Sequence, residues 1–460
     1  MNIVVVGRGS AGWLSALYAK TAYPDSDVVV VYDENVPIIG VGEGTTPMFV
    51  RFMKFVGISI EELIRNCDGT IKNGIKFTNW KGDGSFYYHG FYQNAPHVYG
   101  YTIDKCSSLS NKNKVGKLDE FCYAIHFDAK KLAEYLEKVG ISKGIRTQNG
   151  KIEDISLDDD GYVSKIHLKN GINLNTDFIF DCTGFTRFFV DKIFKSPFKS
   201  FEKYLPIKRA MPFFLPRDDV VSPYTEAIAM KYGWMWKIPV GERIGCGYVF
   251  DSDYITDEEA YDEICEITGQ KPDIRKKISF KSGYFTKPLN KNTLAIGLSH
   301  GFLEPLEATS LHIAVCMLME LPFIKDYQEY VDDYNKFATN LVENCVDIVH
   351  FHYLTTRQDT KFWKEFRVKN VIPEGLKKTI EKLQSHDFTE IEKNIFSICN
   401  YIACAHGQGY ISYDTDPKLK GFIEFYEKCI DEDTDRCKFH EDVIQYCKDS
   451  SRVNNASPLA

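Results

Sequence analysis

The chain has 460 residues, of which 44% are hydrophobic and 26% are charged, and it carries a formal net charge of −8 at pH 7. This composition is typical of a globular protein with two or three modules. The negative charge and the lack of a large basic cluster argue against nucleic acid or an anionic membrane as a partner. No stretch is long and apolar enough to span a bilayer, and the N-terminus does not resemble a signal peptide.

Thirteen cysteines are scattered between Cys67 and Cys447, and none of them forms a C-x-x-C pair. Their number is odd, and no His, Cys and carboxylate cluster has the spacing of a metal site. We therefore expect reduced, mostly buried thiols, a cytoplasmic location and no metal.

The first predicted unit is a strand, a glycine turn and a helix. Residues 2–6 (NIVVV) have the pattern of a buried strand, a G-x-G-x-x-G turn follows, and a second strand (DVVVVYD) ends at Asp33. In this context the turn predicts a dinucleotide site for FAD or NAD, with pyrophosphate at the helix N-terminus and an acid on the ribose. Glu34 is the alternative ribose acid. The predicted cofactor residues here are Gly7, Gly9, Ser10, Ala11, Gly12 and Asp33.

Two later segments favour the same α/β unit. Residues 177–185 (DFIFDCTGF) are a strand that runs into a glycine turn, and residues 292–321 are a strand, a glycine-rich turn and a helix. Ligands of α/β sheets bind where strands end, so we expect Asp181, Gly184 and Gly297 to line the cofactor pocket.

The rest of the chain is expected to form two further regions. Aromatic, strand-like runs within about 205–290 predict an interleaved, mainly antiparallel sheet, and the pattern becomes helical and charged after about 325. We therefore predict an α/β fold with a module over 1–340 that contains this sheet, and a mainly helical region over 341–460. The last ten residues are expected to be disordered.

The run WMWKIP (234–239) places two of the five tryptophans at alternate positions. On a strand, residues 234 and 236 project to one side, so two bulky rings form a continuous surface. Ile238 and Pro239 stiffen its end. We call Trp234, Trp236, Ile238 and Pro239 the tryptophan wall.

Together these motifs resemble the flavin-dependent tryptophan-halogenase family. The resemblance covers roughly residues 1–365, and it is weak over the last hundred. The Lys- and Asn-rich composition favours a phage-encoded member. The motifs are the glycine turn, GVGEGTTP (40–47), IKNGIKFTNW (71–80), HFDA (126–129), DCTGF (181–185), WMWKIP, GFLEPLEATS (301–310) and TTRQDTKFW (355–363).

The resemblance implies a flavin monooxygenase type of fold and a chemistry split between two places. Reduced FAD, O₂ and a halide give hypohalous acid, which travels through a tunnel to Lys72, while the tryptophan wall keeps organic substrate away from the flavin. The lysine either hydrogen-bonds the acid or traps it as a haloamine. Glu307 stabilises the cationic arene intermediate and accepts its proton. Lys76 and Glu304 are the neighbouring alternatives.

Other residues follow from the same resemblance. Residues 40–47, which we call the strap, are expected to lie over the flavin through Gly40, Val41, Gly42 and Glu43. Thr309 and Ser310 occupy the halide site, and because the family usually has glycine at the second position, we expect a preference for bromide or iodide over chloride. His126 is expected to be structural.

We therefore predict an FAD-dependent halogenase that acts on an electron-rich small aromatic of the indole, phenol or pyrrole type. A second, NADH-type fingerprint is absent, which favours FADH₂ supplied by a separate flavin reductase. The alternatives are an FAD-dependent aromatic hydroxylase and a non-catalytic flavin-binding protein. The oligomeric state stays open, and a homo-oligomer is compatible with the sequence.

Overall fold

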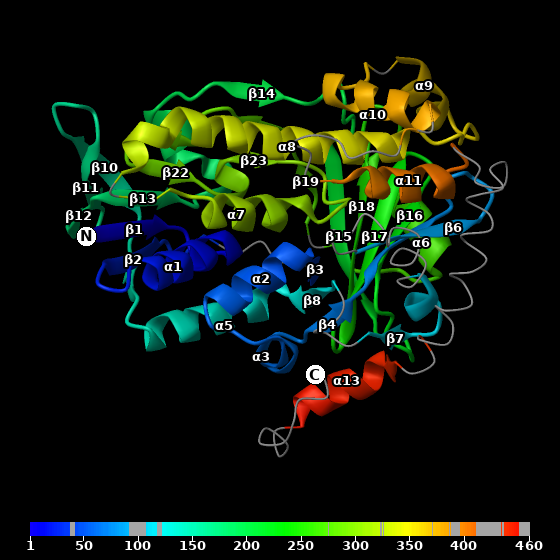
Figure 1. The fold of residues 1–460 in the computed structure, drawn as a ribbon, viewed down its shortest axis with the longest axis horizontal. Coiled ribbons are helices and arrows are strands. Elements are labelled where there is room, and N and C mark those ends of the chain that lie inside the picture. The colour runs from blue at the N-terminus through cyan, green and yellow to red at the C-terminus, as the bar shows by residue number, and fades with distance from the viewer. Residues whose placement is uncertain are drawn as a thin grey trace.

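A computed structural model describes residues 1–36, 42–91, 107–116, 122–274, 276–322, 324, 326–369, 371–385, 387, 396–410, 434 and 437–449. None of the helices in these ranges has the length and apolar character that crossing a membrane requires. Figure 1 shows two sheet regions side by side, bridged by the long helix α8.

The first region contains the predicted strand, turn and helix. It is a six-stranded sheet in the order β21-β22-β13-β1-β2-β9, and it is parallel except for the β21–β22 pair. Its inner strands β1, β2 and β13 are buried apolar runs, as expected where both faces of a sheet are covered, whereas the edge strand β9 is polar and mostly exposed. The bounds are β1 Asn2–Val6, β2 Asp27–Tyr32, β9 Arg146–Asn149, β13 Phe178–Asp181, β21 Leu289–Asn290 and β22 Thr293–Ala295.

The second region is a seven-stranded sheet in the order β19-β15-β18-β17-β16-β5-β6. It is antiparallel except for the β16–β5 pair, as the aromatic pattern predicted. The interleaving extends further than expected, because two strands from residues 74–90 complete it. The bounds are β5 Gly74–Thr78, β6 Phe86–Gly90, β15 Arg209–Pro216, β16 Thr225–Ala229, β17 Gly233–Pro239, β18 Arg243–Phe250 and β19 Ile278–Ser279.

Small sheets connect the two regions. The sheet β3-β8-β4 joins the end of the strap to the segment that carries Lys72. The other small sheets have the orders β10-β11-β12, β14-β20-β23 and β24-β7. The bounds are β3 Gly42–Gly44, β4 Thr70–Lys72, β7 Lys114–Val115, β8 Ala124–Asp128, β10 Ile152–Leu157, β11 Val163–Leu168, β12 Asn173–Asn175, β14 Phe198–Ser200, β20 Gly283–Phe285, β23 Gly301–Phe302 and β24 Lys438–Phe439.

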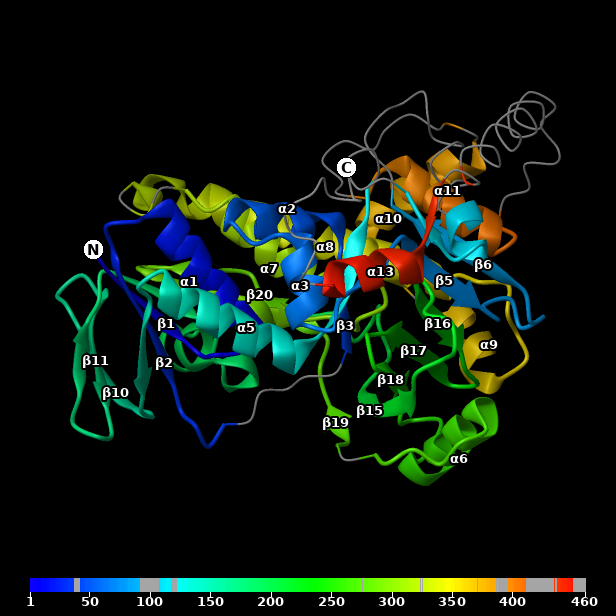
Figure 2. The ribbon, with the colours of Figure 1, turned by 90° about the horizontal axis from the view of Figure 1, so that it is seen from below.

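The helices cover both regions and share one large core with the six-stranded sheet. In Figure 2 the C-terminal helix α13 lies beside α3, next to the small sheet. The bounds are α1 Ser10–Ala22, α2 Pro47–Phe55, α3 Ile60–Asn66, α5 Ala129–Ser142, α6 Asp257–Thr268, α7 Thr309–Met319, α8 Val331–Tyr353, α9 Lys361–Lys369, α10 Glu374–Gln384, α11 Ile398–Gly407 and α13 His440–Lys448.

The predicted elements around residues 178–181 and 293–319 are confirmed. The C-terminal part of the chain is mainly helical where it is described, but the expected boundary between 340 and 341 falls inside α8, which runs without interruption from 331 to 353. The helical pattern at 420–430 and the last ten residues lie outside the described residues. All eleven described cysteines are free thiols, and seven of them are buried.

Candidate active site

Lys72 lies at the end of β4 and is almost completely buried, with 1% of its surface exposed. Its Nζ donates a hydrogen bond to the Thr45 carbonyl oxygen at 2.9 Å and lies 5.3 Å from the centre of the Phe91 ring. Gly44 makes room for the amine, because a Cβ there would lie 3.3 Å from Nζ. The end of the strap therefore holds the lysine.

Burial lowers the pKa of Lys72 to about 8, although the charge of Glu307 acts in the opposite direction. About a tenth of the amine is then neutral at pH 7, far more than for a lysine with the usual pKa. Lys76 differs in each respect. Its side chain is partly exposed, and it pairs with Glu226 at 3.9 Å and lies over the Phe86 ring. The structure thus gives Lys72, and not Lys76, the surroundings of a reactive amine.

Glu307 is buried between two histidines that come from distant elements. His89 Nδ1 on β6 donates to Glu307 Oε1 at 2.9 Å, and His352 Nε2 on α8 donates to the same oxygen at 2.6 Å. Burial alone would raise the pKa of Glu307, but the charges and hydrogen bonds of His89 and His352 lower it well below its usual range. The carboxylate is therefore ionised and fixed in position.

This arrangement stabilises the protonated form of both histidines. Burial opposes their charge, but Glu307 and Cys404 raise the pKa of His89 well above its usual value and that of His352 to about 9. His89 Nε2 also donates to Asn400 Oδ1 at 2.7 Å. Cys404 Sγ lies 3.9 Å from His352 Nε2.

This cluster was not found by the sequence reasoning. Ligand atoms of His89, His352 and Cys404 lie within 4.8 Å of one another, which is a spacing that a metal ion accepts. However, the raised pKa values mean that protons compete with any cation there. His352 and Cys404 are 52 positions apart, and His89 lies much earlier in the chain, so their spacing in the sequence gives no signal. Only the alternation of Tyr87 and His89 on one strand hints at a polar face.

Glu304, the alternative carboxylate, serves the tryptophan wall. Its Oε1 accepts from Trp234 Nε1 at 2.9 Å and from the Tyr353 hydroxyl at 2.5 Å, whereas its buried Oε2 has no partner among the described residues. Burial raises the pKa of Glu304 to about 7. The two glutamates therefore have different protonation behaviour, and Glu307 is the one whose charge reaches Lys72.

The two tryptophan rings lie on one side of β17, with their centres 6.1 Å apart. Trp236 packs on Gly247 of the neighbouring strand, where a Cβ would lie 2.2 Å from the ring. Ile238 is buried. The Pro239 carbonyl accepts from the Thr70 hydroxyl at 2.7 Å, so the end of β17 is fastened to the strand of Lys72.

The predicted halide residues begin α7. Ala308 before the helix has a left-handed backbone with φ of 55°. Thr309 is fully buried, and its hydroxyl has no partner among the described residues. Ser310 lines a small cavity together with Gly297, His300 and Phe302. Free N–H groups at a helix start and an unpaired hydroxyl are suited to an anion.

The glycines of the turn differ in how closely other atoms approach them. Gly7 has φ of 119° and a Cβ there would lie 2.2 Å from the Cys182 carbonyl, while a Cβ on Gly12 would lie 1.9 Å from the Gly7 carbonyl. Gly9 instead faces open space, as does Gly184. Gly297 approaches Ala11, with 2.8 Å left for a Cβ. Ser10 opens helix α1, so these predicted cofactor residues converge on one edge of the sheet.

The predicted acids differ in what they contact. Asp33 follows β2 and accepts from the backbone and side chain of Asn35 at 3.0 and 2.9 Å. The Asp181 carboxylate is fully buried and accepts hydrogen bonds from Thr183, Phe189 and Val190. These bonds fix the conformation of residues 181–190. Its direct contact with FAD stays a prediction. Gly40 and Val41 lie outside the described residues, while Gly42 and Glu43 form β3.

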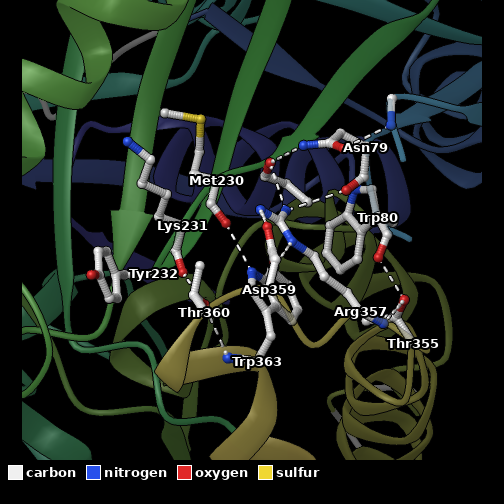
Figure 3. A network of polar contacts seen from close by, with 12 residues as sticks. Asn79, Trp80, Met230, Lys231, Tyr232, Thr355, Arg357, Asp359, Thr360 and Trp363 are labelled. Carbon is white, nitrogen blue, oxygen red and sulfur yellow. Dashed lines mark hydrogen bonds and ion pairs between the residues drawn. The ribbon is translucent and has the colours of Figure 1, made fainter. Parts of the chain in front are cut away.

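Two of the family-like motifs meet around Arg357 (Figure 3). The guanidinium donates to the carbonyls of Asn79 and Ala229 at 3.2 and 3.0 Å, and it pairs with Asp359. Trp80 donates to the Ala227 carbonyl at 2.9 Å, and Trp363 donates to the Met230 carbonyl at 2.9 Å. These motif residues thus fix the loop after β5 against the loop before β17.

Two buried histidines support the strand of Lys72. His126 bonds the hydroxyls of Thr70 and Thr225 at 3.0 and 2.9 Å; burial, Lys72 and His440 lower its pKa well below its usual value, as suits a structural role. His440 Nε2 on α13 accepts from the Ile71 N–H at 2.9 Å, and its Nδ1 donates to the Val221 carbonyl at 3.0 Å. The sequence reasoning missed His440.

Comparison with known proteins gives one consistent result. The family model of the tryptophan halogenases matches residues 2–106 and 96–423. Tryptophan 6-halogenase SttH of Streptomyces toxytricini is 29% identical, with 91% of each chain covered, and tryptophan 7-halogenase RebH of Lentzea aerocolonigenes is 28% identical over the same shares. The solved structure of BrvH, a flavin-dependent halogenase from Brevundimonas sp. BAL3, has a TM-score of 0.87, 26% identity and coverage of 97% of this chain and 99% of its own.

Proposed function

Because this chain belongs to the tryptophan-halogenase family and is thus a flavin-dependent halogenase, we propose that it halogenates an electron-rich small aromatic and that Lys72 and Glu307 are the catalytic residues. The observation that carries the proposal is the buried amine of Lys72, which is held by the strap and within reach of the charge of Glu307. A hydroxylase would have no use for this pair.

The residues at the sheet edge fit an FAD molecule. Gly9 and Gly184 leave space next to the backbone, and the Nε atoms of Arg8 and Arg187 are buried without a partner among the described residues. Space and unpaired cationic donors suit the pyrophosphate of a dinucleotide. Bound reduced flavin would supply the electrons that turn O₂ and halide into hypohalous acid. We further propose that a separate reductase delivers the reduced flavin.

Thr309 and the start of α7 would hold the halide. The N–H groups of the first helical turn and the unpaired Thr309 hydroxyl offer donors in a region from which water is largely excluded. The tryptophan wall lies on β17, and Glu304 and Gly247 keep its rings in place. It would keep the aromatic substrate on the side of Lys72 and Glu307.

Lys72 would receive the hypohalous acid. A neutral amine either accepts a hydrogen bond from the acid or attacks its halogen with release of water, and the pKa of about 8 makes the neutral form available. The Thr45 carbonyl and the Phe91 ring orient the nitrogen in both cases.

Glu307 would act on the arene. When the halogen adds, the ring becomes cationic and must lose a proton. A carboxylate that two histidines keep ionised stabilises this charge and accepts the proton. Substrates of the indole, phenol and pyrrole types all meet this requirement, and free tryptophan is one candidate.

The decisive experiment compares Lys72→Ala with Lys76→Ala. Each variant receives FAD, a flavin reductase and bromide, and a panel of aromatics is analysed by mass spectrometry. We expect Lys72→Ala to lose brominated product while oxygen consumption by reduced flavin continues, and Lys76→Ala to keep product at about the wild-type level. Brominated product from Lys72→Ala, or hydroxylated product without halide in the wild type, would contradict the proposal.

A further inference from the structure

Cys404 on α11 is fully buried next to the residues that hold Glu307. Its Sγ lies 3.9 Å from His352 Nε2, and this same nitrogen lies 2.6 Å from Glu307 Oε1. One imidazole nitrogen thus separates a thiol from the carboxylate that is proposed to act on the arene. The proposed reaction does not use this thiol.

A second Cys–His pair in the chain provides an internal comparison. Cys316 Sγ lies 3.6 Å from His312 Nε2 on α7, but the other nitrogen of His312 bonds the Thr46 hydroxyl, a neutral group, at 2.9 Å. Burial lowers the pKa of His312 to about 4 and raises that of Cys316 to about 12. This cysteine is a neutral thiol.

Cys404 differs from Cys316 because its neighbour His352 donates to the Glu307 carboxylate. Burial would raise its pKa, but the imidazolium groups of His352 and His89 lower it to about 7. The thiolate is the nucleophilic form of cysteine, so a large share of Cys404 is reactive at neutral pH. The geometry and the charges agree that Cys404 is the more nucleophilic thiol of the two pairs.

We propose that Cys404 is a site of oxidation by hypohalous acid that the enzyme itself forms and that no arene has consumed. This rests on the proposed function, which delivers that acid to Lys72, an amine that the charge of Glu307 reaches. The thiolate sulfur attacks the halogen; an S–X bond forms, the O–X bond breaks and hydroxide leaves. Water then displaces halide from sulfur and gives a sulfenic acid, a halide ion and a proton.

The modification would lower activity through its neighbours. Sulfur loses two electrons to the halogen, and the thiolate that helps to keep His352 charged is replaced by a neutral sulfenic acid. His352 then donates less strongly to Glu307. Because thiols reduce sulfenic acids by way of a mixed disulfide, the loss is reversible. Cys404 thereby couples activity to the supply of aromatic substrate.

The test uses wild type, Cys404→Ser and the matched control Cys316→Ser. Each enzyme turns over with FAD, reductase, O₂ and bromide but without arene, and a portion is then unfolded in the presence of dimedone, so that buried sulfenic acids are labelled before peptide mapping. We expect the Cys404 peptide to be labelled at least about tenfold more than the Cys316 peptide, because Cys404, unlike Cys316, lies beside a histidine that is bonded to a carboxylate. Wild type and Cys316→Ser lose activity and regain it with a thiol. Cys404→Ser lacks the thiolate from the start, so we expect a lower initial activity that does not fall further during this turnover and that a thiol does not raise.

Two further arms separate this proposal from the proposed function. Hypobromite added directly to the wild type without flavin should oxidise Cys404 before Cys316, so that dimedone labels the Cys404 peptide whether or not the enzyme forms the acid itself. Wild type supplied with arene from the start should show little labelling. Equal labelling of Cys404 and Cys316, or loss of activity by Cys404→Ser at the wild-type rate, would overturn the proposal. If Cys404→Ser is inactive from the outset, the labelling of the wild type decides alone.

Discussion

At the residue scale, Glu307 combines a buried position with a full negative charge. In Glu307→Gln the side chain keeps its shape, but the two histidine cations lose the charge that they balance. We expect turnover to fall about a hundredfold or more, because the cationic arene is no longer stabilised. FAD should remain bound. The measurement is product formation together with flavin titration, and wild-type turnover would remove Glu307 from the mechanism.

Ser310 is the residue at which a halide preference can be tested. It lines a cavity with Gly297 and follows the unpaired Thr309 hydroxyl. Chloride is small and strongly hydrated, so it needs closely placed donors, and a serine side chain alters the approach that glycine would allow. We expect bromide or iodide to be used over chloride at equal concentrations. Ser310→Gly should shift the product ratio toward chloride, and a clear excess of chlorinated product from the wild type would contradict this.

At the scale of one element, strand β17 carries the tryptophan wall and connects it to two other parts of the site. Trp234 donates to Glu304 and the strand end bonds Thr70. We expect Trp234→Ala with Trp236→Ala to release more hypohalous acid to solvent and to give little hydroxylated product, because the proposed tunnel is formed by more than these two rings. A chemical trap for the acid and product analysis measure both effects.

The control for this prediction is Trp234→Phe, which keeps a bulky ring but removes the indole N–H. It should retain most of the separation while leaving Glu304 with the Tyr353 hydroxyl as its donor. Abundant hydroxylation in the double variant would mean that the wall alone separates the two chemistries.

At the scale of the whole molecule, the C-terminal helix α13 packs against β4, the strand that carries Lys72. His440 accepts from the Ile71 N–H, and burial lowers its pKa to about 4. In the unfolded chain a histidine has a pKa near 6.5, so as the pH falls it takes up a proton before the folded chain does. The contribution of neutral His440 to the free energy of unfolding is therefore fully present above about pH 6.5 and is lost as the pH falls toward 4. This contributes at most about 3 kcal/mol.

We therefore expect His440→Gln to show a shallower fall in the free energy of unfolding between about pH 6.5 and 4 than the wild type. Denaturant titrations at several pH values give the slope. His167 is partly buried on β11, the middle strand of the sheet β10-β11-β12, far from α13 in the sequence, and His167→Gln is the matched control that should keep the wild-type slope. Equal slopes for wild type and His440→Gln would contradict the prediction.

Much of the architecture was predictable from local pattern. The uninterrupted apolar strands, the glycine turn and the alternate tryptophans each follow from rules that act over a few residues. Lys72 was chosen from a motif, and its burial is consistent with that choice. The predicted boundary near residue 340 lies within α8, which is a single helix from 331 to 353.

The sequence by itself determined the elements, the cofactor turn and the family, because these are written in contiguous stretches. Only the tertiary structure decided the surroundings of each reactive group. His89, His352, Asn400 and Cys404 come from three elements and meet around one carboxylate. His440 reaches β4 across 369 positions and lies beyond the residues that the family model matches. Burial and charge pairing arise only when distant segments pack, and they set the pKa of each group.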